Sequence, residues 1–346
     1  MKHQTTRYGE IPFYKIGTFG NIADAFISKK LFLEYKTKYS FPKKGDILIS
    51  ASGTIGRAVI YDGKPAYFQD SNIVWIDNDE TLVKNDFLFY VYSNVKWNTE
   101  HTTILRLYND NFRNTLIPLP PLNEQSAIAN ILNALDRYLY TLDSLILKKE
   151  SVKKALSFEL LSQRKRLKGF NQAWQKVRLG DIANYLTSNL SVEQITQQGK
   201  IKVYDVNNFI GYTDTTFISD KPYISIVKDG SVGRVRILPP KTNILSTMGA
   251  LIANHRTTTE FLFYLLSNFD FKNFTSGSII PHIYFKDYKE KTIFLPPLNE
   301  QIAIANILSA LDNEITSLKN KKRQFENIKK ALNHDLMSAK IRVLKK

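Results

Sequence analysis

Two short segments carry residue types that could bind a phosphate or a guanine base. They read SGTIGR at 52–57 and DGSVGR at 229–234, and in each of them two glycines surround a small hydroxyl residue before an arginine. Glycine lets backbone amides approach a phosphate, and arginine can donate two hydrogen bonds to a phosphate or a guanine edge. The candidate binding residues are Gly53, Thr54, Gly56, Arg57, Gly230, Ser231, Gly233 and Arg234. The alternative is that the glycines only shape a tight hairpin turn and that the arginines are solvated.

A second pair of segments combines hydroxyl, basic and aromatic side chains. These segments are HTTILRLYNDNFRN at 101–114 and FTSGSIIPHIYFKDYKE at 274–290. Such side chains suit contacts to phosphates and base edges, although the aromatic ones could equally belong to a core. The candidate nucleic-acid contacts are Thr102, Thr103, Arg106, Tyr108, Ser276, Ser278, His282, Tyr284 and Lys286.

The sequence carries no recognised catalytic signature. SGTIGR lacks the Lys-Ser/Thr pair of a nucleotide-binding loop, and LPPL offers no Asn or Asp as in the NPPY motif of amino-methyltransferases. Five histidines are scattered without metal-ligand spacing, and there is no cysteine to form a thiolate site or a disulfide. We therefore expect a chain that is not an enzyme and has no cofactor or metal of its own. A complete nucleic-acid enzyme is disfavoured, although scattered carboxylates could still assemble in space.

The elements that position these residues occur twice. LPPLNEQSAIANILNALD at 119–136 and LPPLNEQIAIANILSALD at 295–312 share sixteen of eighteen residues at an offset of 176. FLFYVYSN at 87–94 and FLFYLLSN at 261–268 repeat as well. The protein is therefore two copies of one unit, each a globular part followed by a long helix.

Each long helix is predicted to begin after a pair of prolines. Asn123 and Asn299 are the expected N-caps, with Glu and Gln in the first turn, at the positive end of the helix dipole. Apolar residues then recur at spacings of three and four for about five heptads, which is typical of a coiled coil. The predicted interface residues are Leu132, Leu135, Leu139, Leu142, Ile146, Leu308, Leu311, Ile315, Leu318 and Phe325, in seams that also include Ile128, Val152, Leu156, Leu160, Ile304, Ile328, Leu332 and Leu336.

The two helices are expected to pack against each other, antiparallel, with approximate internal twofold symmetry. One chain then closes both seams, whereas in the alternative each seam binds another protein. The globular parts are predicted to be mixed α/β. Strands are indicated by β-branched and apolar runs at 45–51, 57–62, 72–76, 222–228 and 234–238, and short helices by the two FLFY segments. The fold class is therefore α/β (α+β), with two globular domains joined by two long helices.

Composition favours a polyanionic partner. The formal net charge is +16, and it divides into +7 for residues 1–170 (24 basic against 17 acidic) and +9 for 171–346 (24 against 15). Lys and Arg that neutralise phosphates release condensed counterions, so an excess in both halves favours nucleic acid. The start MKHQTTRYGE does not resemble a signal peptide, and no run is long enough to span a bilayer, so a cytoplasmic location without membrane contact is expected.

Two variable globular units, each followed by LPPLNEQxAIANIL and a long Leu/Ile heptad helix, resemble the specificity (S) subunit of Type I restriction-modification systems. The resemblance spans almost the whole chain and depends most on the duplicated proline-bracketed helix start. It implies that each globular unit is a target recognition domain for one half of a bipartite site in double-stranded DNA. It also implies a coiled coil that sets the gap between the half-sites. Two methyltransferase (M) subunits would dock on the coiled coil, and two restriction (R) subunits would join them. S-adenosylmethionine, ATP and Mg would belong to those partners.

The resemblance suggests domain boundaries. Two alternative functions remain beside it. Target recognition domains are expected at 1–118 and 171–294, and helical repeats at 119–170 and 295–346. The rivals are a coiled-coil scaffold or interaction protein without a DNA-reading role, and a specificity subunit of another multi-subunit restriction-modification type. A scaffold predicts binding that is insensitive to salt, whereas phosphate contacts predict a steep salt dependence.

The two units differ at their beginning. The second opens with WQKVRLGDIA at 174–183, about twenty residues before IKVYDVN, whereas the first begins almost directly at the counterpart IPFYKIG, residues 11–17. The first domain is therefore expected to lack an opening strand and helix, as if a changed start codon or a recombination event had removed them.

Overall fold

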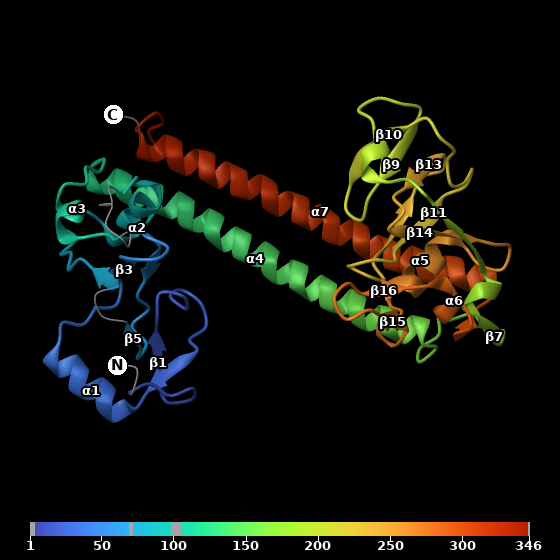
Figure 1. The fold of residues 1–346 in the computed structure, drawn as a ribbon. Helices are drawn as coiled ribbons and strands as arrows, with labels where there is room; N and C mark the ends of the chain where they lie inside the picture. Colours follow the sequence, from blue (N-terminus) through green and yellow to red (C-terminus); the bar gives the residue numbers. More distant parts are fainter. Residues whose placement is uncertain (1–3, 69–71, 98–105, 345–346) are drawn as a thin grey trace. The chain divides into compact units, whose positions relative to one another are not determined.

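A computed structural model of the chain describes residues 4–68, 72–97 and 106–344, which form two compact units (Figure 1). Unit 1 comprises residues 1–143 and 320–346, and unit 2 comprises Ser144–Lys319. The long helices α4 (Leu122–Leu161) and α7 (Leu298–Met337) each contribute one part to either unit. Among the described residues, no helix is both long and apolar enough to cross a membrane.

The globular part of unit 1 contains two three-stranded sheets and three short helices. One sheet has the order β2-β1-β5 and the other β4-β3-β6, with β3 buried at the centre of the second. Helix α2 packs its buried face over β3 and against the start of α4 in one hydrophobic cluster. The elements are β1 (Ile11–Tyr14), β2 (Ala25–Ile27), α1 (Lys29–Lys38), β3 (Ile47–Ser50), β4 (Ala58–Ile60), β5 (Tyr67–Phe68), β6 (Ile73–Trp75), α2 (Asn85–Asn94) and α3 (Asn109–Arg113).

Unit 2 repeats this plan with additional strands. Its central sheet has four strands in the order β12-β11-β14-β8, beside a β10-β9-β13 sheet and two antiparallel pairs of strands, β15-β16 and β17-β7. The elements are β7 (Gln175–Arg178), η1 (Leu179–Asp181), β8 (Ala183–Thr187), η2 (Val192–Gln194), β9 (Ile201–Tyr204), β10 (Phe209–Thr213), β11 (Tyr223–Val227), β12 (Val235–Leu238), β13 (Thr242–Ile244), β14 (Met248–Ala253), α5 (Thr259–Ser267), η3 (Lys272–Phe274), β15 (Thr275–Ser276), β16 (His282–Ile283), α6 (Phe285–Tyr288) and β17 (Thr292–Leu295).

The predicted mixed fold and its internal repeat are confirmed. Strands β3, β4, β6, β11 and β12 lie inside the apolar runs predicted as strands, and the two FLFY segments lie in helices α2 and α5. The opening strand and helix expected at the start of the second globular part are β7 and the 3-10 helix η1, and a second strand, β8, follows them.

Both long helices begin two residues earlier than predicted, at Leu122 and Leu298. The backbone N–H of Gln125 donates to the carbonyl of Pro121 at 2.9 Å, and Gln301 donates to Pro297 in the same way. Proline lacks an N–H but keeps its carbonyl, so it can accept the first bond of a helix. Asn123, predicted as the N-cap of α4, therefore lies inside the first turn, where its side-chain oxygen accepts from the N–H of Glu124.

The helices pair antiparallel within each unit. In unit 1 the side chains that meet are Glu124 with Arg342, Asp136 with Lys329, and Asp143 with Lys322, so one sequence number rises as the other falls. In unit 2 Lys153 pairs with Asp312, and Arg166, just beyond α4, pairs with Glu300. This is the antiparallel intramolecular coiled coil of the predicted fold class.

The seam between the helices is less apolar than its heptad pattern suggests. Leu132 and Leu308 are fully buried, and the other predicted interface leucines, isoleucines and Phe325 are buried or half-buried. Val152 and Ile328, which occupy equivalent positions in the two repeats, are 45% and 50% exposed. The neighbouring residues Lys153 and Lys329 reach the partner helix in their place.

Candidate nucleic-acid interface

The two Gly-rich segments form the same hairpin turn, once in each unit. In unit 1 the N–H of Gly56 donates to the carbonyl of Ser50, and in unit 2 Gly233 donates to Val227, both at 2.9 Å. The glycines have φ angles between 70° and 81°, in the left-handed region where other residues are strained. The glycines thus shape the hairpin turns between β3 and β4 and between β11 and β12. This is the turn-forming role that the sequence offered as the alternative to phosphate binding.

An aromatic ring leaves no space for a side chain at the second glycine of each turn. A Cβ placed on Gly56 would lie 2.2 Å from Nε1 of Trp97, and one placed on Gly233 would lie 2.6 Å from Cδ2 of Phe271. These distances leave no room for a side chain. The exposed hydroxyl residues Thr54 and Ser231 stand at the tips of the turns that these contacts hold.

The two arginines that end the turns differ in their surroundings. Arg57 is half-buried, and its guanidinium lies within hydrogen-bond reach, 3.2 Å, of the Asn21 side-chain amide oxygen in the amide orientation that satisfies both groups. Arg234 is exposed and has no ion-pair partner in the part of the chain that the structure describes. Arg234 is therefore the better placed of the two to meet a phosphate or a base edge.

The structure joins each turn to the second predicted segment of the same unit. The N–H of Leu107 donates to the carbonyl of Ala51 at 2.8 Å, and in unit 2 Ile283 donates to Lys228 at 2.9 Å. Isolated bridges pair Ser52 with Arg106 and Asp229 with His282. Two sequence features that lie about fifty residues apart thus form one continuous surface in each unit.

In unit 2 this surface includes most of the predicted contacts. Gly230 donates its N–H to the carbonyl of Pro281 at 2.9 Å, which ties the turn to the loop between β15 and β16. His282 Nδ1 lies 2.7 Å from Asp229 Oδ1, and this contact holds the imidazole ring in place. Ser276 and Ser278, in β15 and the following loop, are exposed.

Two aromatic side chains are presented beside the turns. Tyr284 is 49% exposed, stacks on His282, and has the Lys286 ammonium 5.5 Å from its ring centre. In unit 1 the equivalent Tyr108 is 42% exposed, with the Arg106 guanidinium 5.8 Å from its ring centre. Exposed rings next to cations suit stacking on bases and contacts to phosphates. Thr102 and Thr103 lie outside the described residues.

Sequence reasoning missed an exposed apolar pair in this surface. Ile279 and Ile280 are 92% and 55% exposed in the loop between β15 and β16. Gly277, at a φ of 90°, tightens this loop, because a Cβ there would lie 2.2 Å from the Ile280 carbonyl oxygen. Two isoleucines between a glycine and a proline are the signal that could have marked this loop. Apolar side chains of this kind contact thymine methyl groups in other proteins.

Matching polar contacts fix the globular part of each unit to its long helices. Gln125 donates from Nε2 to the carbonyls of Leu82 and Pro120 and accepts from the N–H of Lys84. Gln301 makes the same pattern in unit 2, with Arg256, Pro296 and Thr258. Both glutamines are fully buried, so the repeated NEQ motif positions helices α2 and α5.

A tyrosine, an aspartate and a lysine meet where each short helix crosses the long pair. In unit 1 the Tyr90 hydroxyl donates to Asp136 at 2.8 Å, while the Lys329 ammonium pairs with the same aspartate and lies 5.7 Å from the Tyr90 ring centre. Burial, followed by the Asp136 carboxylate, raises the pKa of Tyr90 well above its usual range. Tyr264, Asp312 and Lys153 repeat this arrangement in unit 2.

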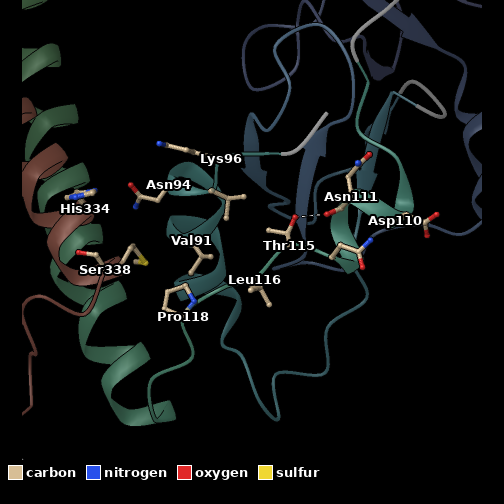
Figure 2. A pocket seen from close by; sticks show the side chains of 13 residues that line it. Val91, Asn94, Lys96, Asp110, Asn111, Thr115, Leu116, Pro118, His334 and Ser338 are labelled. Atoms are coloured by element: carbon tan, nitrogen blue, oxygen red, sulfur yellow. Dashed lines mark hydrogen bonds between the residues drawn. The ribbon is translucent and has the colours of Figure 1, made fainter. Parts of the chain in front are cut away.

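Unit 1 also contains a cleft of about 660 Å³ (Figure 2). It is lined by the end of α2, by α3, by the segment 114–118 and by the last turn of α7. Its lining mixes apolar side chains with neutral polar ones and includes Lys96 and His334 as well as Asp110. Throughout the described residues, no group of three or more His, Asp or Glu side chains is placed to hold a metal ion.

The family described as Type I restriction modification DNA specificity domain matches residues 1–149 and 171–327. The chain belongs to this family of specificity subunits. The double match coincides with the two repeats of the sequence. The resemblance that the duplicated LPPLNEQ helix start indicated is thereby confirmed. Specificity subunits carry DNA-recognition domains and are not themselves enzymes.

Individual specificity subunits align with this chain to different extents. A putative type I restriction enzyme specificity subunit of Haemophilus influenzae is 64% identical over 134 residues, which is 38% of this chain and 35% of that protein. The putative MjaX specificity subunit of Methanocaldococcus jannaschii is 29% identical over 337 residues, covering 86% of this chain and 79% of that protein.

Two solved structures share the fold. The S subunit of a type I restriction-modification system from M. genitalium aligns with a TM-score of 0.65 at 20% identity, over 97% of this chain and 91% of that one. A chain from a study of complex assembly and conformational transition of the type I R-M system aligns at 0.55 and 17% identity, over 85% and 82%. Because both identities are low, the likeness of these two structures to this chain shows a shared fold and nothing further.

Proposed function

We propose that this specificity subunit reads a bipartite DNA target, with one half-site contacted by each globular part. The observation that carries the proposal is the duplicated surface, in which the same hairpin turn is hydrogen-bonded to the same following segment in both units. The proposed contacts are the exposed turn residues, Arg57 and Arg234, and the side chains around Tyr108 and Tyr284. The excess of positive charge in both halves of the sequence supports contacts to phosphates in both units.

We further propose that the paired helices set the number of base pairs between the half-sites. Each helix has 40 residues, about 60 Å at 1.5 Å per residue. Linked readers gain affinity by effective concentration when the link matches the distance between their sites. We assign the readers to 1–118 and 171–294 and the spacing repeats to 119–170 and 295–346.

The proposed partners are methyltransferase and restriction subunits of a type I system, two of each, with the former docked on the helical repeats. The methyl donor, ATP and Mg would be bound by those partners, and the assembly would act in the cytoplasm. The near-identity of residues 119–136 and 295–312 supports two equivalent docking positions, because equal surfaces bind equal partners.

The test is to co-express the chain with the methyltransferase subunit encoded beside it and to sequence the host DNA with a method that detects methylated bases. The expected result is one methylated motif made of two short half-sites separated by a gap of fixed length. A motif with one part would show that only one globular part reads DNA. No methylation and no complex would favour the scaffold.

A further inference from the structure

The loop between β15 and β16 of unit 2 carries an apolar tip, formed by Ile279 and Ile280 (Figure 1). Ile279 is 92% exposed and Ile280 is 55% exposed. Single apolar side chains on a protein surface are common and need no explanation. Here two isoleucines are adjacent and follow the exposed hydroxyl residues Ser276 and Ser278, so the apolar tip has a polar rim. An exposed apolar group with a polar rim is typical of an interaction site.

The backbone on both sides of the apolar tip is held in place. Strands β15 and β16 pair antiparallel, with Thr275 opposite Ile283, and Ile283 is 1% exposed. The Pro281 carbonyl accepts the N–H of Gly230 at 2.9 Å, which ties the loop to the hairpin turn between β11 and β12. Gly277 bends the loop with a φ angle of 90°, which other residues rarely adopt. Because isoleucine also has few side-chain rotamers, little order remains to be gained when the tip meets a partner.

The surroundings of the apolar tip favour DNA over a protein partner. Arg234, at the end of the tied turn, and Lys286, shortly after β16, are exposed and form no ion pair in the part of the chain that the structure describes. Asp229, the acidic residue of the turn, is in contact with His282, with 2.7 Å between Oδ1 and Nδ1. Cations beside the tip match the phosphates and base edges of DNA. Two isoleucines are also far fewer apolar side chains than the core of a protein interface contains.

We propose that Ile279 and Ile280 contact the C5-methyl groups of thymine bases in the major groove of one half-site and thereby select A·T base pairs there. Thymine is the base that presents a methyl group at this edge, and apolar side chains are the ones that contact it. Removing this methyl group from water is favourable, so a base pair that lacks it binds the apolar tip less tightly. The inference rests on the proposed function, because it assigns a readout to one part of the surface proposed to contact DNA.

The shape of the element also fits this groove. The major groove is about 12 Å wide and admits a two-stranded β-ribbon. Strands β15 and β16 form such a ribbon, and the apolar tip lies in the loop that joins them. Ser276 and His282, which are paired across the ribbon, place hydrogen-bonding groups next to the apolar ones. One ribbon can therefore contact both the methyl groups and the donors and acceptors of neighbouring base edges.

The test uses the complex of this chain with its methyltransferase subunit and short DNA duplexes that carry the methylated motif. Each thymine of the motif, on either strand, is replaced in turn by deoxyuridine, which lacks only the C5-methyl group. Fluorescence anisotropy measures the affinity for each duplex. The parent complex is expected to bind about fourfold more weakly where a contacted thymine is replaced, the effect of one buried methyl group. Because the apolar tip belongs to unit 2 alone, all such thymines should lie in the same half-site.

Chain variants show whether the apolar tip is the group that reads the methyl. The double variant Ile279→Ala/Ile280→Ala should bind the unmodified duplex about tenfold more weakly. Replacing thymine by deoxyuridine should then cause it no further loss of affinity. Val192→Ala, which removes a 65% exposed apolar side chain from η2 of the same unit, is the control and should keep the full effect of deoxyuridine.

The proposal is wrong if neither half-site contains an A·T pair, if no deoxyuridine duplex binds more weakly, or if the double variant keeps the full effect of deoxyuridine. Weaker binding by the double variant without any dependence on thymine methyl groups would overturn it as well, because the isoleucines would then make another contact, such as a wedge between base pairs. A parent complex that binds no DNA would instead count against the proposed function, and the inference would fall with it.

Discussion

The Lys153 ammonium in α4 lies 2.5 Å from the Asp312 carboxylate in α7. The equivalent contact in unit 1 joins Lys329 to Asp136. Each lysine follows a heptad position whose own residue, Val152 or Ile328, is about half exposed. A shift of one helix by a heptad in either direction would place Asp312 opposite Ile146 or Leu160 instead of Lys153, so this pair favours one antiparallel alignment.

The first prediction concerns this contact. Asp312→Ala should lower the free energy of unfolding by about 1–2 kcal/mol, because it leaves the Tyr264 hydroxyl and the Lys153 ammonium without their partner in a half-buried site. Chemical denaturation monitored by circular dichroism measures the change. Glu150→Ala, which removes the more exposed pair with Lys319, is the control and should cost less than about 0.5 kcal/mol. Equal costs for the two variants would contradict a special role for Asp312.

The second prediction separates two reasons why the hairpin turns require glycine: a left-handed φ angle and a lack of space for a side chain. Gly230 and Gly233 have φ angles of 81° and 80°, but a Cβ on Gly230 meets nothing within 4 Å, whereas one on Gly233 collides with Phe271. Gly230→Ala should therefore cost about 1 kcal/mol from backbone strain alone. Gly233→Ala should cost at least about 1 kcal/mol more. Thermal melting of both variants would test this, and equal melting temperatures would contradict the packing argument.

The third prediction is a pH dependence from the pair Glu124 and Arg342. The Arg342 guanidinium, through its hydrogen bond, holds the pKa of Glu124 below its usual value of 4.5. A folded-state pKa below the unfolded one contributes stability above about pH 4.5, and this stability is lost as the pH falls through the folded pKa. Glu124→Gln should therefore melt below the parent protein at pH 7.

The difference between the two melting temperatures should shrink as the pH falls below 4.5, because the parent then loses the same charge. The control is Glu290→Gln, at the exposed pair with Arg178, where little difference is expected at any pH. A difference for Glu124→Gln that stays constant from pH 7 to pH 3 would show that its charge is not the cause.

The fourth prediction tests DNA contact by the turns. Because Arg234 is exposed and Arg57 is held by Asn21, Arg234→Ala should weaken the assembled complex on its DNA more than Arg57→Ala does. A lost phosphate contact should also reduce the slope of log affinity against log salt by about 1. Lys221→Ala, at an exposed position before β11 and at the end of that strand opposite the turn, removes the same charge and serves as the control. Unchanged affinity in both turn variants would exclude these arginines as contacts.

The fifth prediction tests whether the helices set the gap in the target. Inserting one heptad of apolar and charged residues into both α4 and α7, at the change from unit 1 to unit 2, keeps the seam in phase. Seven residues lengthen a helix by about 10 Å. The gap in the methylated motif should therefore grow by about 3 base pairs, since ten base pairs span about 34 Å. An unchanged gap, read from methylation-sensitive sequencing, would assign the spacing to another part of the complex.

The sequence alone determined the architecture, because its strongest signals are local or repeated. Proline, the NEQ motif and spacings of three and four act within one helix, so residues 119–136 and 295–312 predicted both long helices and their pairing. The glycines at 53, 56, 230 and 233 marked both turns, since a left-handed φ angle is a local demand. The duplicated pattern also predicted the specificity-subunit family that the comparison later showed.

Tertiary structure decided which side chains are available, because exposure depends on segments far away in the sequence. The heptad pattern could not show that Val152 and Ile328 face solvent while the next residues, Lys153 and Lys329, reach aspartates on the other helix. No spacing rule joined Gly230 to Pro281 across fifty residues. Nor could the sequence show that Leu119 is exposed while its identical counterpart Leu295 is buried. That difference depends on whether a neighbouring strand covers the residue, and only the packed fold supplies or withholds one.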